Sequence, residues 1–222
     1  MREQIKRYLL FLLGLYVNSL GIAFITRADL GTSPISSVPY TLSLGFSPTL
    51  GMFTLYMSLV LVLLQVLLLR KTFPLIWVLQ IPFSFLFSCF IDLSMDMLSF
   101  LQTDAYLLKL LYLLIGCGIL GTGVYLEMAA NVVMLPGEAF VCAVSLAFHT
   151  DFGKTKVAFD SAMVLLAGVI SLLLFHKLAG IREGTVLAAL LVGTIARFLN
   201  RRISFLGRFL QKTPVKAESS AE

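Results

Sequence analysis

Charged residues are scarce in this sequence: Asp, Glu, Lys and Arg make up 13% of its 222 residues, against 59% hydrophobic residues. A soluble domain carries about 25% charged residues, so this composition excludes that class. No stretch is polar enough to form a soluble domain of its own. Together with a mean hydropathy of +0.95, these features indicate an all-α integral membrane protein.

The residues of catalytic and metal sites are equally sparse. The chain has two histidines and three cysteines, and Cys89, Cys117 and Cys142 all lie inside apolar runs without metal-ligand spacing. It has no glycine-rich phosphate loop, no zinc-binding pattern and no Ser/His/Asp set. We therefore expect neither an enzyme nor a bound cofactor or metal.

Positive charge gathers at the ends of the apolar segments and of the chain. The net charge is +5, and basic residues precede the first apolar run and crowd the stretch after Leu199. We attribute them to topology rather than to nucleic-acid binding, and expect both termini in the cytoplasm. The first run continues to Ile25 without a cleavage site, so we expect it to be retained. Residues 201–222 are expected to form a partly disordered basic tail.

Six apolar segments are long enough to cross a hydrocarbon core of roughly 30 Å at about 1.5 Å per residue. They run from Tyr8 to Thr26, Met52 to Leu69, Pro74 to Ile91, Tyr106 to Met128, Val157 to Phe175 and Gly184 to Leu199. Two more, Pro34 to Phe46 and Pro136 to His149, are too short to span. Each half is therefore predicted to contain three spanning helices and one short, broken or re-entrant helix.

Both short segments open on a proline beside hydroxyl, small or acidic residues. Thr32 and Ser33 precede Pro34, and Gly137 and Glu138 follow Pro136. Proline fits the first helical position, and the polar side chains can meet unpaired N–H groups there, so both segments are expected to begin helices. Two matching broken elements in an otherwise continuous apolar protein are typical of a transport site.

The pattern repeats at a constant shift of 102 residues without gaps. The shift pairs Gly14 with Gly116, Gly21 with Gly123, Ala28 with Ala130, Asp29 with Asn131, Pro34 with Pro136, Ser43 with Ser145, Phe46 with Phe148 and Gly51 with Gly153. Glycine and proline matches in one register mark backbone constraints rather than bulk apolarity. They predict one membrane domain built by internal duplication, with repeat one over residues 6–98 and repeat two over residues 105–200.

The two halves could run parallel or inverted. If the short segments span, the chain crosses eight times with parallel halves; if they re-enter, it crosses six times with inverted halves. With the N-terminus inside, six crossings put Arg70 and Lys71 inside and Lys109 outside, and eight crossings reverse all three. Positive charge and the shortness of the segments favour six, and the alternative stays open.

Three stretches carry a resemblance to a known family. A glycine-rich first span runs into Ala28–Pro34, the second half contains Leu135–Glu138, and Phe152–Lys156 follows. These resemble the YczE/YyaS/YitT family of bacterial membrane proteins, over roughly residues 8 to 200. The resemblance implies a multi-pass protein of the bacterial inner membrane, regarded as a transporter without an agreed substrate. Without a soluble C-terminal domain, the chain is similar to the short YczE type.

Polar residues within or beside the apolar runs are the candidate substrate ligands. Glu127 and Asp160 lie inside spans, where an ionised group would cost about 2.5 to 3.5 kcal/mol at the bilayer centre, so they should face a cavity or a partner. Structural ion pairs with Lys154, Lys156 or Arg197 are the alternative. The full candidate set is Asn18, Asp29, Gly31, Thr32, Ser33, Ser36, Glu127, Asn131, Gly137, Glu138 and Asp160. For Asn18 a bond between helices, for Glu138 a capping role, and for Asp29 an interfacial pair with Arg27 are the structural alternatives.

Two functions fit these features. The first is a small-molecule permease in which paired half-helices offer N–H groups and positive dipole ends to a polar substrate near the bilayer middle. The second is a non-transporting component, such as a substrate-capture subunit of an energised transporter or an accessory membrane protein. Expected partners are the lipid bilayer and an unidentified small polar molecule, with a homo-oligomer or a partner subunit left open.

Overall fold

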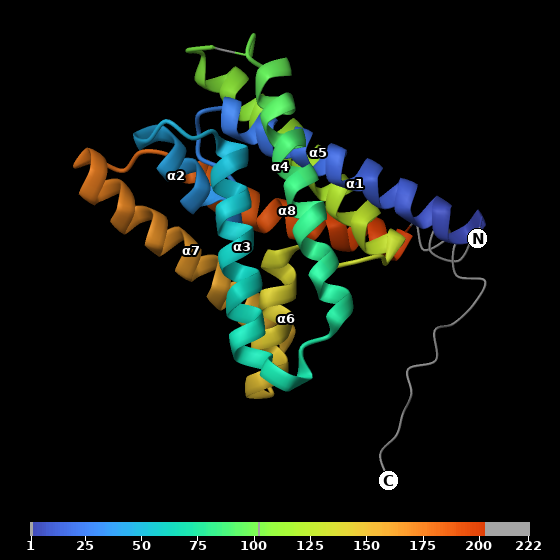
Figure 1. Cartoon of the computed structure of the whole chain (residues 1–222). Helices are drawn as coiled ribbons and strands as arrows, with labels where there is room; N and C mark the ends of the chain where they lie inside the picture. The colour runs from blue at the N-terminus through green and yellow to red at the C-terminus, as the bar shows by residue number, and fades with distance from the viewer. Residues whose placement is uncertain (1, 102, 203–222) are drawn as a thin grey trace.

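The computed structural model describes residues 2–101 and 103–202, and in these residues it contains helices and no strands. The long helices are α1 (Arg2–Arg27), α3 (Leu50–Leu69), α4 (Gln80–Met97), α5 (Tyr106–Ala130), α7 (Phe152–Phe175) and α8 (Glu183–Arg202). The short ones are η1 (Pro34–Ser36), α2 (Ser37–Gly45), η2 (Arg70–Thr72), η3 (Leu75–Leu79) and α6 (Pro136–Phe148). The predicted all-α class and the order of long and short elements are confirmed (Figure 1).

Five segments are long and apolar enough to cross a membrane: Gln4–Arg27, Leu50–Leu69, Leu75–Met97, Tyr106–Ala130 and Phe152–Phe175. The protein is therefore of the multi-pass membrane type. The sixth predicted span corresponds to α8, a 20-residue helix whose sequence is more polar and which is not among the five. Its crossing stays a prediction. The basic tail lies outside the described residues from position 203 onward.

Helices α1 and α5 form the central pair, and they run antiparallel (Figure 1). Gly14 in α1 lies against Glu127 near the end of α5, and Gly116 in α5 lies against Ile25 near the end of α1. In between, Gly21 faces the backbone of Leu120 so closely that a Cβ would collide with it. The glycines matched by the 102-residue shift are thus what lets the two backbones approach each other.

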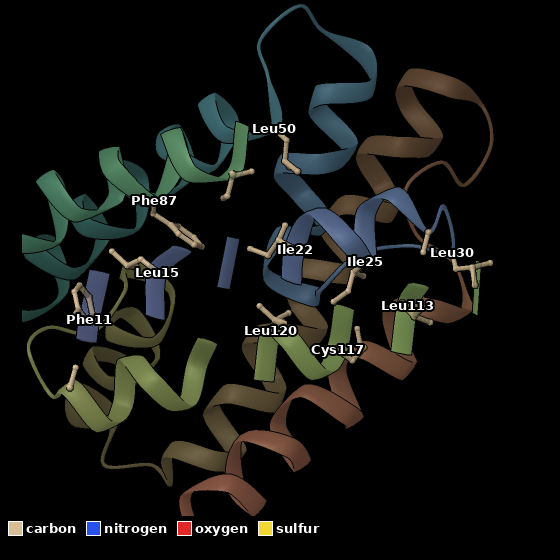
Figure 2. Packing of buried hydrophobic residues seen from close by; sticks show 14 residues of the cluster. Phe11, Leu15, Ile22, Ile25, Leu30, Leu50, Phe87, Leu113, Cys117 and Leu120 are labelled. Carbon is tan, nitrogen blue, oxygen red and sulfur yellow. The ribbon is translucent and has the colours of Figure 1, made fainter. Parts of the chain in front are cut away.

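The main apolar core surrounds this pair (Figure 2). Phe11, Leu15 and Ile25 of α1 are fully buried, as are Leu113 and Cys117 of α5. Helix α4 packs along α1, and α8 packs along α5, so each member of the pair has one further long partner. Burial is highest in α1 and lowest in α7: 56% of the most apolar stretch of α1 is buried, against 17% of that of α7. Most of α7 is therefore available for contact with lipid.

A buried amide network ties α3, α4 and α6 together. Gln65 and Gln80 are fully buried and exchange hydrogen bonds of 3.3 and 3.2 Å through their side chains. The Gln65 amide also donates to the carbonyl oxygen of Pro136 at 3.1 Å, at the first position of α6. In an apolar interior these bonds fix the start of α6 relative to the α3–α4 hairpin.

The internal repeat stays a prediction, as do its bounds at residues 6–98 and 105–200. The packing partners fit it: the short α2 packs on α7, and the short α6 packs on α3, so each short helix contacts the other half. The halves differ at their last helix, because α3 packs along α4 whereas no comparable α7–α8 packing occurs in the described part of the chain.

Candidate functional site

Each short helix is preceded by a long helix that ends in a left-handed residue. Asp29 follows α1 with φ 54°, and Asn131 follows α5 with φ 47°. Asn and Asp tolerate this conformation because their short polar side chains bond locally. The Asp29–Asn131 match of the sequence therefore marks two chain reversals. Neither residue is buried, and the N–H of Asn131 caps α5 by donating to the Glu127 carbonyl oxygen at 3.2 Å.

The first reversal is held by buried hydroxyls that bond to one another. Thr32, Ser33 and Ser36 are 0%, 6% and 4% exposed. The Ser33 hydroxyl donates to that of Ser36 at 2.9 Å, the Thr32 hydroxyl lies 3.3 Å from that of Thr26, and the Thr32 N–H donates to Thr185 Oγ1 at 3.3 Å. In this conformation these predicted ligands act as structural partners of one another. Gly31, with φ 117°, lies against Thr185, where a Cβ would collide.

The starts of the two short helices meet. Pro34 and Pro136 occupy the first positions of η1 and α6, as predicted. Gly137 in α6 is buried against the side chain of Ile35 in η1, so closely that a Cβ on Gly137 would overlap the Ile35 Cδ1. Positions 35 and 137 are related by the 102-residue shift. The contact therefore brings equivalent points of the two predicted repeats together.

Four more of the predicted ligands, Asn18, Glu127, Glu138 and Asp160, form a cluster linked by a hydrogen bond and by charge interactions. Asn18 donates to Glu127 Oε1 at 2.7 Å across the α1–α5 pair, and Glu127 is 7% exposed. Lys156 and Asp160 form an ion pair of 2.9 Å on α7. Glu138 stands in the first turn of α6, where the charges of Glu127, Lys156 and Asp160 act on it. The cluster thus holds three carboxylates and one ammonium group.

Glu138 differs from the other members of this cluster. Among the described residues its carboxylate makes no hydrogen bond and no ion pair, whereas Asp160 has Lys156 and Glu127 has Asn18. No side-chain cap is formed at the start of α6 either, so Glu138 does not meet the N–H groups there. In this conformation Asp160 forms the ion pair with Lys156, and Asn18 the bond between helices, that were predicted as their structural alternatives.

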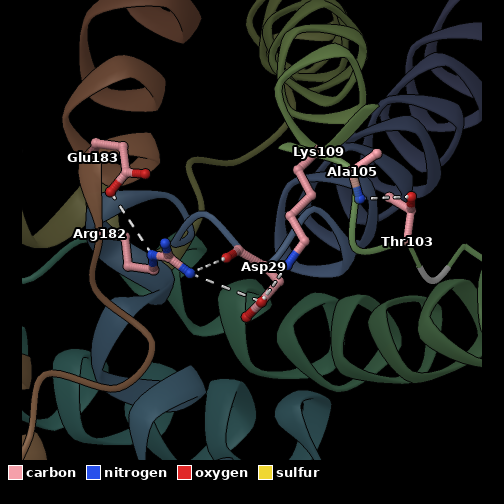
Figure 3. A network of polar contacts seen from close by, with 6 residues as sticks. All are labelled: Asp29, Thr103, Ala105, Lys109, Arg182 and Glu183. Atoms are coloured by element: carbon pink, nitrogen blue, oxygen red, sulfur yellow. Dashed lines mark hydrogen bonds and ion pairs between the residues drawn. The ribbon is translucent and has the colours of Figure 1, made fainter. Parts of the chain in front are cut away.

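Asp29 belongs to a separate network on one face of the protein (Figure 3). Its carboxylate pairs with Lys109 at 2.8 Å and lies 4.0 Å from Arg182, which also contacts Glu183 at 3.8 Å. The alternative of a pair between Asp29 and Arg27 is wrong: Arg27 points to α4 and donates to the Met95 carbonyl oxygen at 2.7 Å. The reversal turns Asp29 outward, so its carboxylate contacts Lys109 of α5 and Arg182, which directly precedes α8.

A large cavity opens on that same face. It has a volume of about 630 Å³ and is lined mainly by polar side chains. Its charged lining residues are Arg27, Asp29, Asp92, Asp96, Asp104 and Lys109, and Thr26, Tyr40 and Ser47 contribute further polar groups. Because Asp29 and Ser47 line one cavity, the chain returns through η1 and α2 to the face at which α1 ends. A second cavity of about 410 Å³ adjoins Leu69 and Pro74, at the opposite end of α3.

The sequence did not predict most of the residues that line the cavity of about 630 Å³. Of the predicted ligands, Asp29 lines it, whereas Arg27, Tyr40 and Asp96 were not predicted. These three residues come from α1, α2 and α4, and no local spacing links them. The Gln65–Gln80 network was missed for the same reason. A metal site is not indicated either: the structured part of the chain contains no group of three His, Cys, Asp or Glu residues that could hold a metal ion.

Comparison with known proteins assigns a family. A family model described as "Family of unknown function (DUF6198)" matches residues 5–201, nearly the whole chain. No curated protein and no solved structure matches the chain. The expected membership of the YczE/YyaS/YitT family stays a prediction.

Proposed function

The chain belongs to this DUF6198 family of unknown function, and we propose that it is a permease for a small polar molecule in the bacterial cell membrane. The observation that carries the proposal is the meeting of the two short helices at Ile35 and Gly137, inside a protein of membrane-length apolar helices. Helix starts within a membrane leave N–H groups that lipid cannot satisfy, and transporters use such groups to hold polar substrates.

The direction of the halves supports alternating access. Helices α1 and α5 occupy equivalent places in the predicted repeats and pack antiparallel, with Gly14 near Glu127 and Gly116 near Ile25. Equivalent helices of parallel halves would point the same way, so the antiparallel pair favours inverted halves and six crossings. Inverted repeats can exchange conformations to expose one central site to either face in turn.

The structure has the features expected of one end state of such a cycle. The cavity of about 630 Å³ lies at one end of α3, and the Ile35 side chain fills the space against Gly137 between the short helices. In the proposed cycle, Ile35 leaves Gly137 when the substrate reaches the helix starts. Glu138 then becomes a ligand, since it carries a carboxylate without a partner among the described residues at that place.

A substrate-capture subunit is the second candidate, because the larger cavity alone would suffice to bind a molecule at one face. Efflux from proteoliposomes separates the two functions. Vesicles containing the purified full chain are loaded with a mixture of small polar metabolites, and the contents are followed by mass spectrometry against protein-free vesicles. A permease releases at least one compound faster than the control vesicles do. Uniform retention of every compound, with binding intact, would assign the capture function instead.

Variants at the short-helix starts test the site itself. We expect Gly31→Val, Ser33→Ala, Gly137→Val and Glu138→Gln to reduce efflux per folded protein. Leu63→Ala and Leu67→Ala, at residues 58% and 60% exposed on the lipid side of α3, are the matched controls. Glu138→Gln is the sharpest variant, because it removes a charge without removing any described hydrogen bond. Unchanged efflux for Glu138→Gln at unchanged thermal stability would remove Glu138 from the site.

A further inference from the structure

The cavity of about 630 Å³ contains charged groups that the fold does not use. Two of its carboxylates are engaged: Asp29 pairs with Lys109 at 2.8 Å, and Asp92 accepts from Thr49 Oγ1 at 2.7 Å and from the Gly51 N–H at 2.8 Å. These contacts hold the loop after α1 and the start of α3. Arg27, Asp96 and Asp104 also line the cavity, and none of the three has an ion-pair partner in the described residues.

Arg27 and Tyr40 are half-buried residues in the lining of the cavity. Arg27 uses one nitrogen to donate to Met95, and its buried Nε has no acceptor among the described residues. The Tyr40 hydroxyl also has no hydrogen bond there, and the charges of Asp29 and Arg27 both act on it. A guanidinium group with free donors beside a phenol hydroxyl is a recognition element for a carboxylate, which Arg can bind through two parallel hydrogen bonds.

The rim has the opposite charge. Asp96, near the end of α4, and Asp104, just before α5, are exposed and line the same cavity. An exposed carboxylate gains little from remote charges in water, yet it can bind an ammonium group that a ligand brings to it. The lining therefore presents a half-buried cation, Arg27, and two exposed anions, Asp96 and Asp104.

We propose that this cavity binds a compact zwitterion of the amino-acid type, with its carboxylate on Arg27 and Tyr40 and its ammonium group near Asp96. This inference rests on the proposed permease function and names the substrate class of its larger cavity. A volume of about 630 Å³ lies in the range of small-molecule sites and leaves room for a side chain. An anion alone would face the rim carboxylates, and a cation alone would leave the Arg27 donors unpaired.

Binding to the purified full chain tests the proposal independently of transport. The probes are the twenty standard amino acids, followed by matched trios such as L-serine, ethanolamine and 3-hydroxypropionate, which keep both charged groups, the ammonium alone or the carboxylate alone. We expect at least one amino acid to bind and to raise the thermal midpoint. Its single-charge counterparts should bind about tenfold or more weakly. Equal binding of ethanolamine and L-serine, or no binding by any amino acid, would overturn the proposal.

Variants decide whether the named residues are responsible. Arg27→Gln and Tyr40→Phe should weaken binding of the amino acid about tenfold, and Arg197→Gln, whose guanidinium bonds its own helix at Gly193, should leave binding unchanged. Asp96→Asn should weaken binding of the amino acid but not binding of 3-hydroxypropionate. Glu183→Gln is the matched control and should leave the binding of both unchanged. If Arg27→Gln does not fold, Tyr40→Phe and Asp96→Asn carry the test. Wild-type affinity in both would reject the site, whereas binding without efflux would reject only the permease function.

Discussion

Asn18 and Glu127 form the most consequential polar contact in the central helix pair. Their side chains meet at 2.7 Å, and both residues are buried, 5% and 7% exposed. A buried polar group left without its partner costs about 1–3 kcal/mol, whereas an exchange that keeps the hydrogen bond costs much less. Substitutions that remove the charge and those that remove the acceptor therefore separate function from folding.

We expect Glu127→Gln to fold nearly as well as the wild type, because its amide oxygen still accepts from Asn18. Glu127→Leu should lose about 1–3 kcal/mol of stability, because the Asn18 N–H is then unpaired. Asp160→Asn gives up a half-exposed pair with Lys156 worth about 0–1 kcal/mol. Thermal denaturation and efflux, measured on the same preparations, should show lost efflux for Glu127→Gln and Asp160→Asn. If both retain wild-type efflux, the role of these charges is structural.

At the scale of elements, the α1–α5 pair organises the rest of the protein. Four glycines, Gly14, Gly21, Gly116 and Gly123, lie where a Cβ would press on the opposite helix. Gly118 lies in the same helix as two of them, but a Cβ there would meet nothing within 4 Å. Gly118 is therefore a control for Gly116 and Gly123. Helix propensity affects all three interior positions of α5 alike, whereas only Gly116 and Gly123 contact α1.

Gly21→Ala and Gly123→Ala should destabilise the protein by about 1–3 kcal/mol, because the added Cβ forces the two backbones apart. Gly118→Ala should be neutral or stabilise by up to about 1 kcal/mol through helix propensity. Denaturation midpoints in detergent provide the comparison. Equal effects at Gly118 and Gly123 would show that the pair does not depend on close backbone packing.

At the scale of the whole molecule, the path of the chain sets which surfaces share a face. Asp29 and Ser47 line one cavity although η1 and α2 lie between them, so the first short element enters and returns. The antiparallel packing of α1 and α5, the equivalent helices of the two predicted repeats, supports the same path. We predict that the basic N-terminus lies inside, and this orientation would make the larger cavity face outward.

Thiol labelling of intact cells tests this topology. In a background with Cys89, Cys117 and Cys142 replaced, we expect an impermeant reagent to label both Asp29→Cys and Ser47→Cys, because the two positions line one cavity that we expect to face outward. Gln4→Cys should react only after permeabilisation. Labelling of Asp29→Cys and Ser47→Cys from opposite sides would establish that the first short helix spans, and labelling of Gln4→Cys from outside would reverse the orientation.

The sequence by itself determined the membrane class, the order of long and short helices and both short-helix starts. Pro34 and Pro136 occupy the first helical positions because a fixed φ and a missing N–H suit that position in any context. The fit of Asp29 and Asn131 to left-handed turns is equally local. Such preferences act within one or two turns of the chain, so neighbours along the sequence are enough to reveal them.

Only the tertiary structure decided that α1 and α5 pack antiparallel and which residues line the cavity. A short apolar segment has the same composition whether it spans or returns, so its sequence left six and eight crossings open. Arg27, Tyr40 and Asp96 come from three helices and meet only because α2 and α4 flank the end of α1. Gln65 and Gln80 likewise meet across a helical hairpin. Contacts of this kind depend on how apolar faces pack in three dimensions, and no spacing along the chain encodes them.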